Sequence, residues 1–74
     1  MSDEPRTLAD AKKGDVVVVE RLRGDPRKTD RLTALGLLPG ISLTVKQIRP
    51  VFVVEAEELH LALERDLAAL VCVG

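Results

Sequence analysis

Hydrophobic residues in this chain fall into short runs, most of them of strand length. Val16–Leu22 opens with four consecutive valines, which favour a strand because β-branched side chains lose rotamer freedom in a helix. The pattern predicts that the first half of this strand is covered on both sides and that the second half is amphipathic. A short helical turn is expected before it, capped by Thr7 and anchored by Leu8 and Ala11.

One helix is predicted near the middle of the chain. Asp25 suits the N-cap and Pro26 the first helical position, so we expect a helix that continues through Arg27–Leu35. At about two and a half turns this helix is marginal alone, so packing against the rest of the domain must stabilise it.

The end of this helix is unusually well specified. Gly36 lies where a left-handed cap is needed, because glycine adopts that conformation without steric cost. In such a cap Leu37 folds back on Leu32. Pro39 and Gly40 then occupy the two central positions of a type II turn, which leads into the next strand.

The second half of the chain predicts four more strands. A half-buried strand is expected over Ile41–Gln47, with a bulge or an end at Ile48, followed by a strand over Val51–Val54. A polar link over Glu55–Glu58 then leads to a strand over Leu59–Glu64. The chain closes with a helical turn over Arg65–Ala69, in which Leu67 points inward, and a strand over Leu70–Val73 with Val71 and Val73 on one face and Cys72 on the other. Five short strands at regular spacing indicate a mainly β fold, a small barrel or sandwich with a short central helix and short helical turns.

The length and composition of the chain limit this fold to one small domain. With 74 residues the core is thin, and with Phe52 as the only aromatic residue it must be aliphatic. We expect residues 1–7 to be a flexible lead and residues 8–74 to form a single domain. No apolar run approaches the roughly 18 residues of a membrane span, and the N-terminus has no apolar signal core, so a cytoplasmic protein is expected.

Charge is balanced overall but unevenly distributed. The net charge is −1, yet Arg21–Arg31 holds five basic and two acidic residues, and Glu55–Asp66 holds five acidic residues and one arginine. Two interpretations stay open: two solvated faces, or a polarised surface that orients docking on a partner. Nucleic-acid binding is not expected, because stacking aromatics are lacking and the net charge is not positive.

Residues that carry chemistry are few. The chain has one histidine, one cysteine and no tyrosine, so an acid–base pair or a nucleophile with an orienting partner is not expected, and we predict a non-enzymatic protein. A single cysteine allows no intramolecular disulfide, and Cys72 fits a small buried hydrophobic residue. Glu57, Glu58 and His60 are weak candidates for a divalent ion, but their spacing matches no known ligand pair, and a solvated turn is the simpler interpretation.

The segment "RLTALGLLPG", after a valine-rich strand and before "ISLTVKQIRP", closely resembles the R-L-x-x-L-G-L-x-P-G signature of the ferrous iron transport protein A (FeoA) family. The lead-in "TLADAKKGDVVVVERLRGD" and the tail "LHLALERDLAALVCV" are similar to the family's opening and closing patterns. The resemblance covers roughly Leu8–Val73. One departure is the segment "VFVVEAEELHL", which lacks the glycine that many members carry at the hairpin turn.

This resemblance implies an SH3-like β-barrel and a small cytosolic accessory protein of bacterial ferrous iron uptake. The implied partner is the cytosolic region of the family's membrane transporter, FeoB, which would place the protein at the inner membrane. The family is also associated with transition metals, so weak Fe²⁺ binding is implied without a defined ligand set or a required cofactor. We expect a monomer or a weak homodimer.

Two further functions stay open beside the transporter-binding role. The same domain occurs in metal-dependent repressors of the diphtheria-toxin-repressor type, so a metal-responsive regulatory domain is one alternative, and a metal-binding protein is the other. For the transporter-binding role, the loop after the helix has two possible interpretations. It is either a purely structural element, made of a helix cap and a turn, or a rigid surface for recognition. The predicted structural turn residues are Gly36 and Gly40, and the predicted partner-binding residues are Arg27, Arg31, Leu35, Leu37, Leu38 and Pro39.

Overall fold

The computed structural model describes residues 6–74, which form a mainly β fold with five strands, two short helices and one 3₁₀ turn. In chain order the elements are the 3₁₀ turn η1 (Leu8–Asp10), β1 (Val16–Leu22), α1 (Pro26–Ala34), β2 (Ser42–Gln47), β3 (Phe52–Ala56), β4 (Leu59–Leu63), α2 (Arg65–Ala68) and β5 (Val71–Val73). No helix in this part of the chain is long and apolar enough to cross a membrane.

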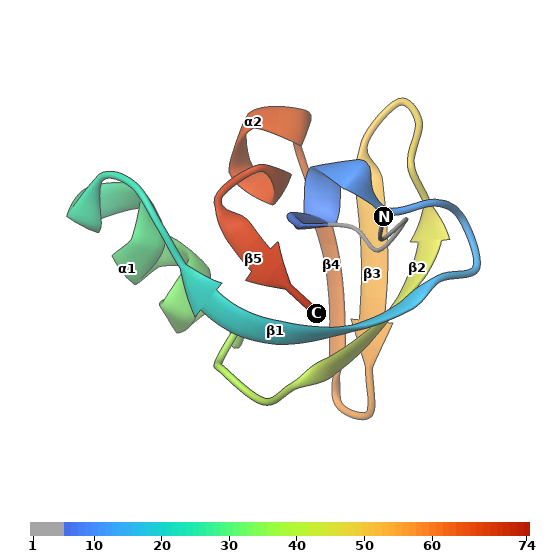
Figure 1. Ribbon diagram of the computed structural model, residues 1–74, viewed down its shortest axis with the longest axis horizontal. Coiled ribbons are helices and arrows are strands. Elements are labelled where there is room, and N and C mark those ends of the chain that lie inside the picture. Colours follow the sequence, from blue (N-terminus) through green and yellow to red (C-terminus); the bar gives the residue numbers. More distant parts are fainter. Residues whose placement is uncertain (1–5) are drawn as a thin grey trace.

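All neighbouring strands pair antiparallel, in the order β4-β3-β2-β1-β5. β1 belongs to both halves of the sheet, because Val16–Val18 pair with β2 and the residues from Val19 to Leu22 pair with β5. Figure 1 shows β1 as a long curved strand that crosses in front of β3 and β4, with β5 above it. The sheet therefore curls around a single core.

Two bulges contribute to this curvature. The register shifts between Val19 and Arg21 where β1 meets β5, and between Val45 and Gln47 where β2 meets β3. A bulge adds a residue to one strand and increases its local twist. The sequence predicts a bulge or a strand end at Ile48: β2 ends at Gln47, and the irregularity lies just before that end.

The core is aliphatic apart from Phe52, whose ring lies under the Arg65 guanidinium at 5.9 Å. Its buried members come from every strand, from η1, from both helices and from the α1–β2 loop: Leu8, Ala11, Val17, Val19, Leu32, Leu37, Leu43, Val45, Phe52, Val54, Leu63, Ala68, Val71 and Val73. The expected anchors Leu8 and Ala11 are among them. Leu67, predicted to point inward, is half-buried, and its neighbour Ala68 is the fully buried residue of α2.

The prediction that the first half of β1 is covered on both sides is wrong. Val17 and Val19 are buried, but Val16 is 66% exposed and Val18 is 42% exposed. A run of valines is equally compatible with one covered face or two, and here only the inner face meets the core. The outer-face valines lie opposite Thr44 and Ser42 of β2.

One predicted boundary also needs correction. Thr7 forms a bridge with Cys72, and the carbonyl of Arg6 accepts a hydrogen bond from the Val73 N–H at 3.1 Å, so the folded unit begins before residue 8. Residues 1–5 of the predicted lead lie outside the described residues. The prediction that Cys72 is buried is confirmed: η1 and Thr7 pack against β5, and Cys72 is buried although it is not part of the core cluster that holds Val71 and Val73.

The hairpin between β3 and β4 is tighter than predicted. Ala56 pairs with Leu59, so the connection is Glu57–Glu58 alone, and Glu55 belongs to β3. Among the described residues no side-chain-bearing residue has a positive φ. The turn therefore differs from the primed turns that glycine and asparagine favour in two-residue hairpins, which is consistent with the missing glycine.

Candidate functional site: the α1–β2 loop and the groove beside it

Helix α1 begins where the sequence predicts. The Asp25 side chain accepts a hydrogen bond from the Arg27 N–H at 2.9 Å, and Pro26 takes the first helical position. Leu35, predicted as the last helical residue, is the C-cap. The helix is anchored by Leu32, its one fully buried side chain.

The end of α1 is the left-handed cap that the sequence predicts. Gly36 has a φ of +102°, its N–H donates to the Thr33 carbonyl at 2.9 Å, and the Leu37 N–H donates to the Leu32 carbonyl at 3.2 Å. These two bonds are the pair that defines a Schellman motif. The chain direction is thus fixed by backbone bonds immediately after the helix.

Leu37 cannot serve as a surface contact as predicted, because its side chain is 0% exposed. It is a core residue, as is Leu32, which precedes the cap and is also fully buried. The apolar contact that commonly accompanies a Schellman motif explains this position. Leu37 therefore has an architectural role.

The turn that follows is held at both ends. The Ile41 N–H donates to the Leu38 carbonyl at 3.2 Å, and Gly40 has a φ of +94°, as the third position of a type II turn requires. The turn is also tied to β1, since the Gly40 N–H donates to the Val19 carbonyl at 2.7 Å and the Val19 N–H donates to the Ile41 carbonyl at 2.8 Å. Leu38 stays 45% exposed on this constrained backbone.

A groove of about 590 Å³ lies between this loop and the β3–β4 hairpin. Gly36, Leu38 and Ile41 line it from the loop side. In Figure 1 the green loop after α1 and the turn between β3 and β4 lie at the same lower end of the molecule. The exposed Leu38 side chain is thus part of a concave surface.

The hairpin supplies the opposite wall, with Ala56 and Leu59 as its apolar residues and Glu57 and Glu58 at its tip. The two walls come close at Gly36, where a Cβ atom would lie 3.1 Å from Leu59 Cδ1. Glycine is favoured here by its left-handed conformation, and a Cβ atom would also require the Leu59 side chain to shift slightly.

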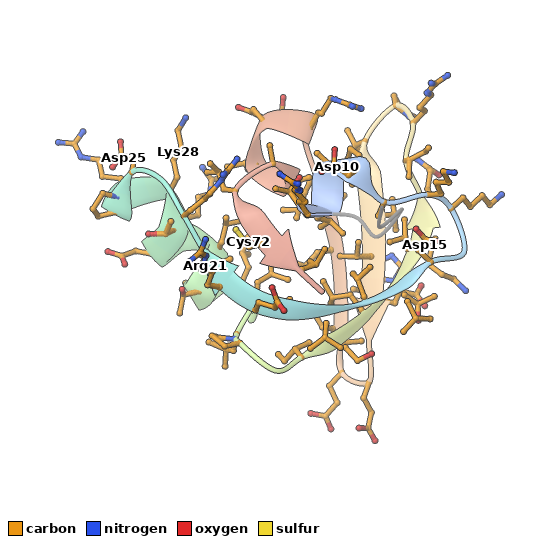
Figure 2. The ribbon with its side chains drawn as sticks, in the orientation of Figure 1. Asp10, Asp15, Arg21, Asp25, Lys28 and Cys72 are labelled. Carbon is orange, nitrogen blue, oxygen red and sulfur yellow. The ribbon has the colours of Figure 1, made fainter. Side chains whose placement is uncertain are left out.

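The remaining predicted partner residues lie outside the groove. Arg27, Arg31 and Leu35 are spaced four residues apart along α1 and its C-cap, so they share one side of the helix, and all three are exposed. Pro39 is exposed in the turn. Figure 2 shows that the neighbouring Lys28 points away from the sheet. The predicted set therefore divides into a helix stripe (Arg27, Arg31, Leu35), the loop tip (Leu38, Pro39) and one core residue.

The residues named as weak metal candidates do not form a ligand set. His60 Nδ1 lies 2.9 Å from Glu55 Oε2, across the β3–β4 pair, and the two side chains are 68% and 38% exposed. Within residues 6–74 no group of three or more histidine, cysteine, aspartate or glutamate side chains is placed to hold a metal ion. Glu57 and Glu58 instead form the exposed tip of the hairpin. Glu57, Glu58 and His60 therefore do not form a transition-metal site among the described residues.

Sequence reasoning missed Leu59 and Ile41 as lining residues of the groove. Both were identified as strand residues, and nothing in their local pattern shows which loop they face. The resemblance fixed the loop, but the groove also requires the pairing of β3 with β4, which brings the hairpin turn beside Gly36. The close approach of Gly36 to Leu59 depends on tertiary structure, which the sequence pattern does not show.

The comparison with protein families identifies the chain. The model of the FeoA domain matches residues 6–74, which is nearly the whole sequence. The chain belongs to the FeoA family. FeoA proteins are small SH3-like proteins related to iron transport, and the cap, turn and groove described above lie within the matched residues. No curated protein sequence is similar enough to count as a match.

Solved structures support the same fold. An iron uptake regulatory protein (FeoA) superposes with a TM-score of 0.84 at 23% identity, over 93% of each chain. Zinc-complexed FeoA from Stenotrophomonas maltophilia, described as an SH3 domain protein, gives 0.79 at 23% identity, over 95% of this chain and 91% of that one. A manganese-dependent transcriptional repressor gives 0.86 at 22% identity, over 93% of this chain but 40% of that one. These likenesses confirm the predicted SH3-like architecture.

Proposed function

We propose that this FeoA-family protein is a small cytosolic, non-enzymatic accessory protein of bacterial ferrous iron uptake. It acts by binding the cytosolic region of the FeoB-like membrane transporter. It is a monomer or a weak homodimer that reaches the inner membrane through this partner, and it does not act on nucleic acid. It needs no resident cofactor, and its affinity for Fe²⁺ is weak.

The observation that carries this proposal is the exposure of Leu38 on a constrained loop. The Leu38 side chain is 45% exposed, although the backbone around it is held by the helix cap and by bonds to β1. An exposed aliphatic side chain on a rigid loop suits recognition, because little conformational entropy is lost when a partner covers it. The helix stripe of Arg27, Arg31 and Leu35 lies outside the groove, and it carries one more exposed leucine, Leu35.

The likeness to the manganese-dependent repressor does not favour a repressor role. At 22% identity it shows the shared fold, and this chain spans 40% of that protein. The regulatory alternative therefore rests on fold alone, whereas the transporter-binding role is supported by the family and by a specific surface.

Calorimetry with three forms of the protein tests this role. The wild-type chain, Leu38→Ala and Val16→Ala are each titrated with the cytosolic region of the cognate transporter. Val16 is the matched control, because it is an exposed aliphatic residue at 66% but lies on β1 away from the groove. We expect saturable binding by the wild type and by Val16→Ala, and binding weakened about tenfold by Leu38→Ala, the usual scale for a contact that is buried at an interface.

Two results would contradict the proposal. If the wild-type chain gives no saturable heat, it does not bind this transporter region directly. If Leu38→Ala and Val16→Ala bind as tightly as the wild type, the transporter is bound elsewhere on the molecule and the loop is architecture only.

A further inference from the structure

The groove beside the α1–β2 loop combines apolar walls with an acidic tip. Leu38 and Ile41 on one side and Leu59 on the other present aliphatic surface, while Glu57 and Glu58 at the hairpin tip are exposed. None of the residues that line this groove is lysine or arginine. The groove therefore suits a ligand with an apolar group between the aliphatic walls and a positively charged group beside Glu57 and Glu58.

The acidic side of the groove continues onto the neighbouring surface of the hairpin. A smaller hollow adjoins it, lined by Glu55, Glu57, Glu58 and His60. Glu55 already has a partner in His60 at 2.9 Å. Glu57 and Glu58 are the exposed carboxylates left to meet an incoming cation, and neither has an ion pair among the described residues.

We propose that this groove binds a segment of the partner protein in which an aliphatic residue is flanked by lysine or arginine. The aliphatic side chain packs between Leu38 and Leu59, and the basic residues lie over Glu57 and Glu58. Complementary charges of this kind fix orientation and raise the rate of association. The inference rests on the proposed function, because it states the chemistry of the transporter segment that the loop would hold.

A second copy of this chain is the other occupant to consider. Its helix stripe carries Leu35 beside Arg31, so it has the same combination of aliphatic and basic residues. Such a contact would join two different surfaces, groove to helix, and would repeat from copy to copy into an open chain instead of closing as a dimer. A segment of a different protein avoids this, so we assign the groove to the partner.

The test uses the full chain labelled with ¹⁵N and two short synthetic peptides. One has the sequence Gly-Lys-Leu-Ile-Lys-Gly, and the other replaces both lysines with glutamate. We expect the lysine peptide to shift the backbone amide signals of Leu38, Ile41 and Leu59, and the glutamate peptide to bind about tenfold more weakly. Added salt should reduce this difference, because the carboxylates are exposed.

Two charge-reversed variants give a matched control. Glu58 immediately precedes β4 and lines the groove, whereas Glu64 immediately follows β4 at the opposite end, and both are exposed. Glu58→Lys should weaken binding of the lysine peptide about tenfold, and Glu64→Lys should change it less than twofold. Both variants change the net charge equally, so a difference between them reports on position.

The outcomes separate this inference from the proposed function. Equal binding of the two peptides, equal effects of the two variants, or no shifts at the groove would overturn the inference even if the transporter region binds. Peptide binding with the expected charge preference would support it even if the transporter region does not bind, and then the proposed partner would be wrong. Self-association that Arg31→Glu abolishes would show that a second copy occupies the groove.

Discussion

Gly36 carries two constraints at once. Its φ of +102° lies in the left-handed region, and a Cβ atom on it would lie 3.1 Å from Leu59 Cδ1. Gly40 carries only the first, because its φ is +94° but nothing lies within 4 Å of the place a Cβ would take. The two glycines were predicted together as turn residues, and the structure distinguishes them.

Alanine at these two positions should therefore have unequal effects. Gly40→Ala should lower the free energy of unfolding by about 1 kcal/mol, because alanine is disfavoured at positive φ. Gly36→Ala should lower it by more, because the new methyl group also has to displace Leu59. Denaturant unfolding of the two variants measures the difference. Equal losses of unfolding free energy in the two variants would show that the contact of an added methyl group with Leu59 has no cost.

At the scale of the element, the cap and turn after α1 assign different roles to two adjacent leucines. Leu37 is 0% exposed and lies in the core, whereas Leu38 is 45% exposed and lines the groove. The backbone bonds of the Schellman motif and of the turn fix both positions. Neighbouring residues of the same type therefore separate into one that stabilises the fold and one that is free to contact a partner.

Stability measurements on alanine variants of both leucines test this division. Leu37→Ala should lower the free energy of unfolding by about 2–5 kcal/mol, the usual cost of truncating a buried leucine. Leu38→Ala should change it by less than about 0.5 kcal/mol, as is usual for surface positions. Chemical denaturation followed by circular dichroism gives both values. Equal destabilisation by the two changes would contradict the recognition role of Leu38 and leave the loop as architecture.

The same element shows what the sequence can predict. Asp25, Pro26 and Gly36 act through bonds to residues nearby in the chain, so the helix start and its cap were predictable from local chemistry. The exposure of Val16 and Val18 was not, because it depends on whether another element covers the outer face of β1. Local signals specify elements, and burial follows from how those elements are assembled.

At the scale of the whole molecule, the curled sheet brings together segments that are distant in the chain. β1 pairs with β2 at one end and with β5 at the other, and the bonds from Val19 to the turn hold the loop against this strand. The β3–β4 hairpin then completes the groove from the other side. The loop was predictable from its motif, but the groove was not, because its second wall depends on long-range strand pairing.

The charge distribution also has a different meaning once the fold is known. The basic stretch predicted from the sequence divides between β1 and the exposed side of α1, and the acidic stretch places Glu57 and Glu58 at the hairpin tip. Figure 2 shows Asp25 and Lys28 at the outer end of α1, away from the sheet. Glu57 and Glu58 therefore line the groove, whereas the basic residues Arg27, Lys28 and Arg31 lie outside it.

The proposed function is the binding of a protein partner, and it does not depend on the binding of metal. One calorimetric experiment tests it directly: the wild-type chain is titrated with the cytosolic region of its cognate transporter in metal-free buffer, and separately with Fe²⁺ alone under anaerobic conditions. We predict saturable heat from the transporter region, and no saturation by Fe²⁺ alone at the same concentrations, because the proposed affinity for Fe²⁺ is weak. Saturable heat from Fe²⁺ with none from the transporter region would contradict this proposed function and make the protein a metal-binding domain.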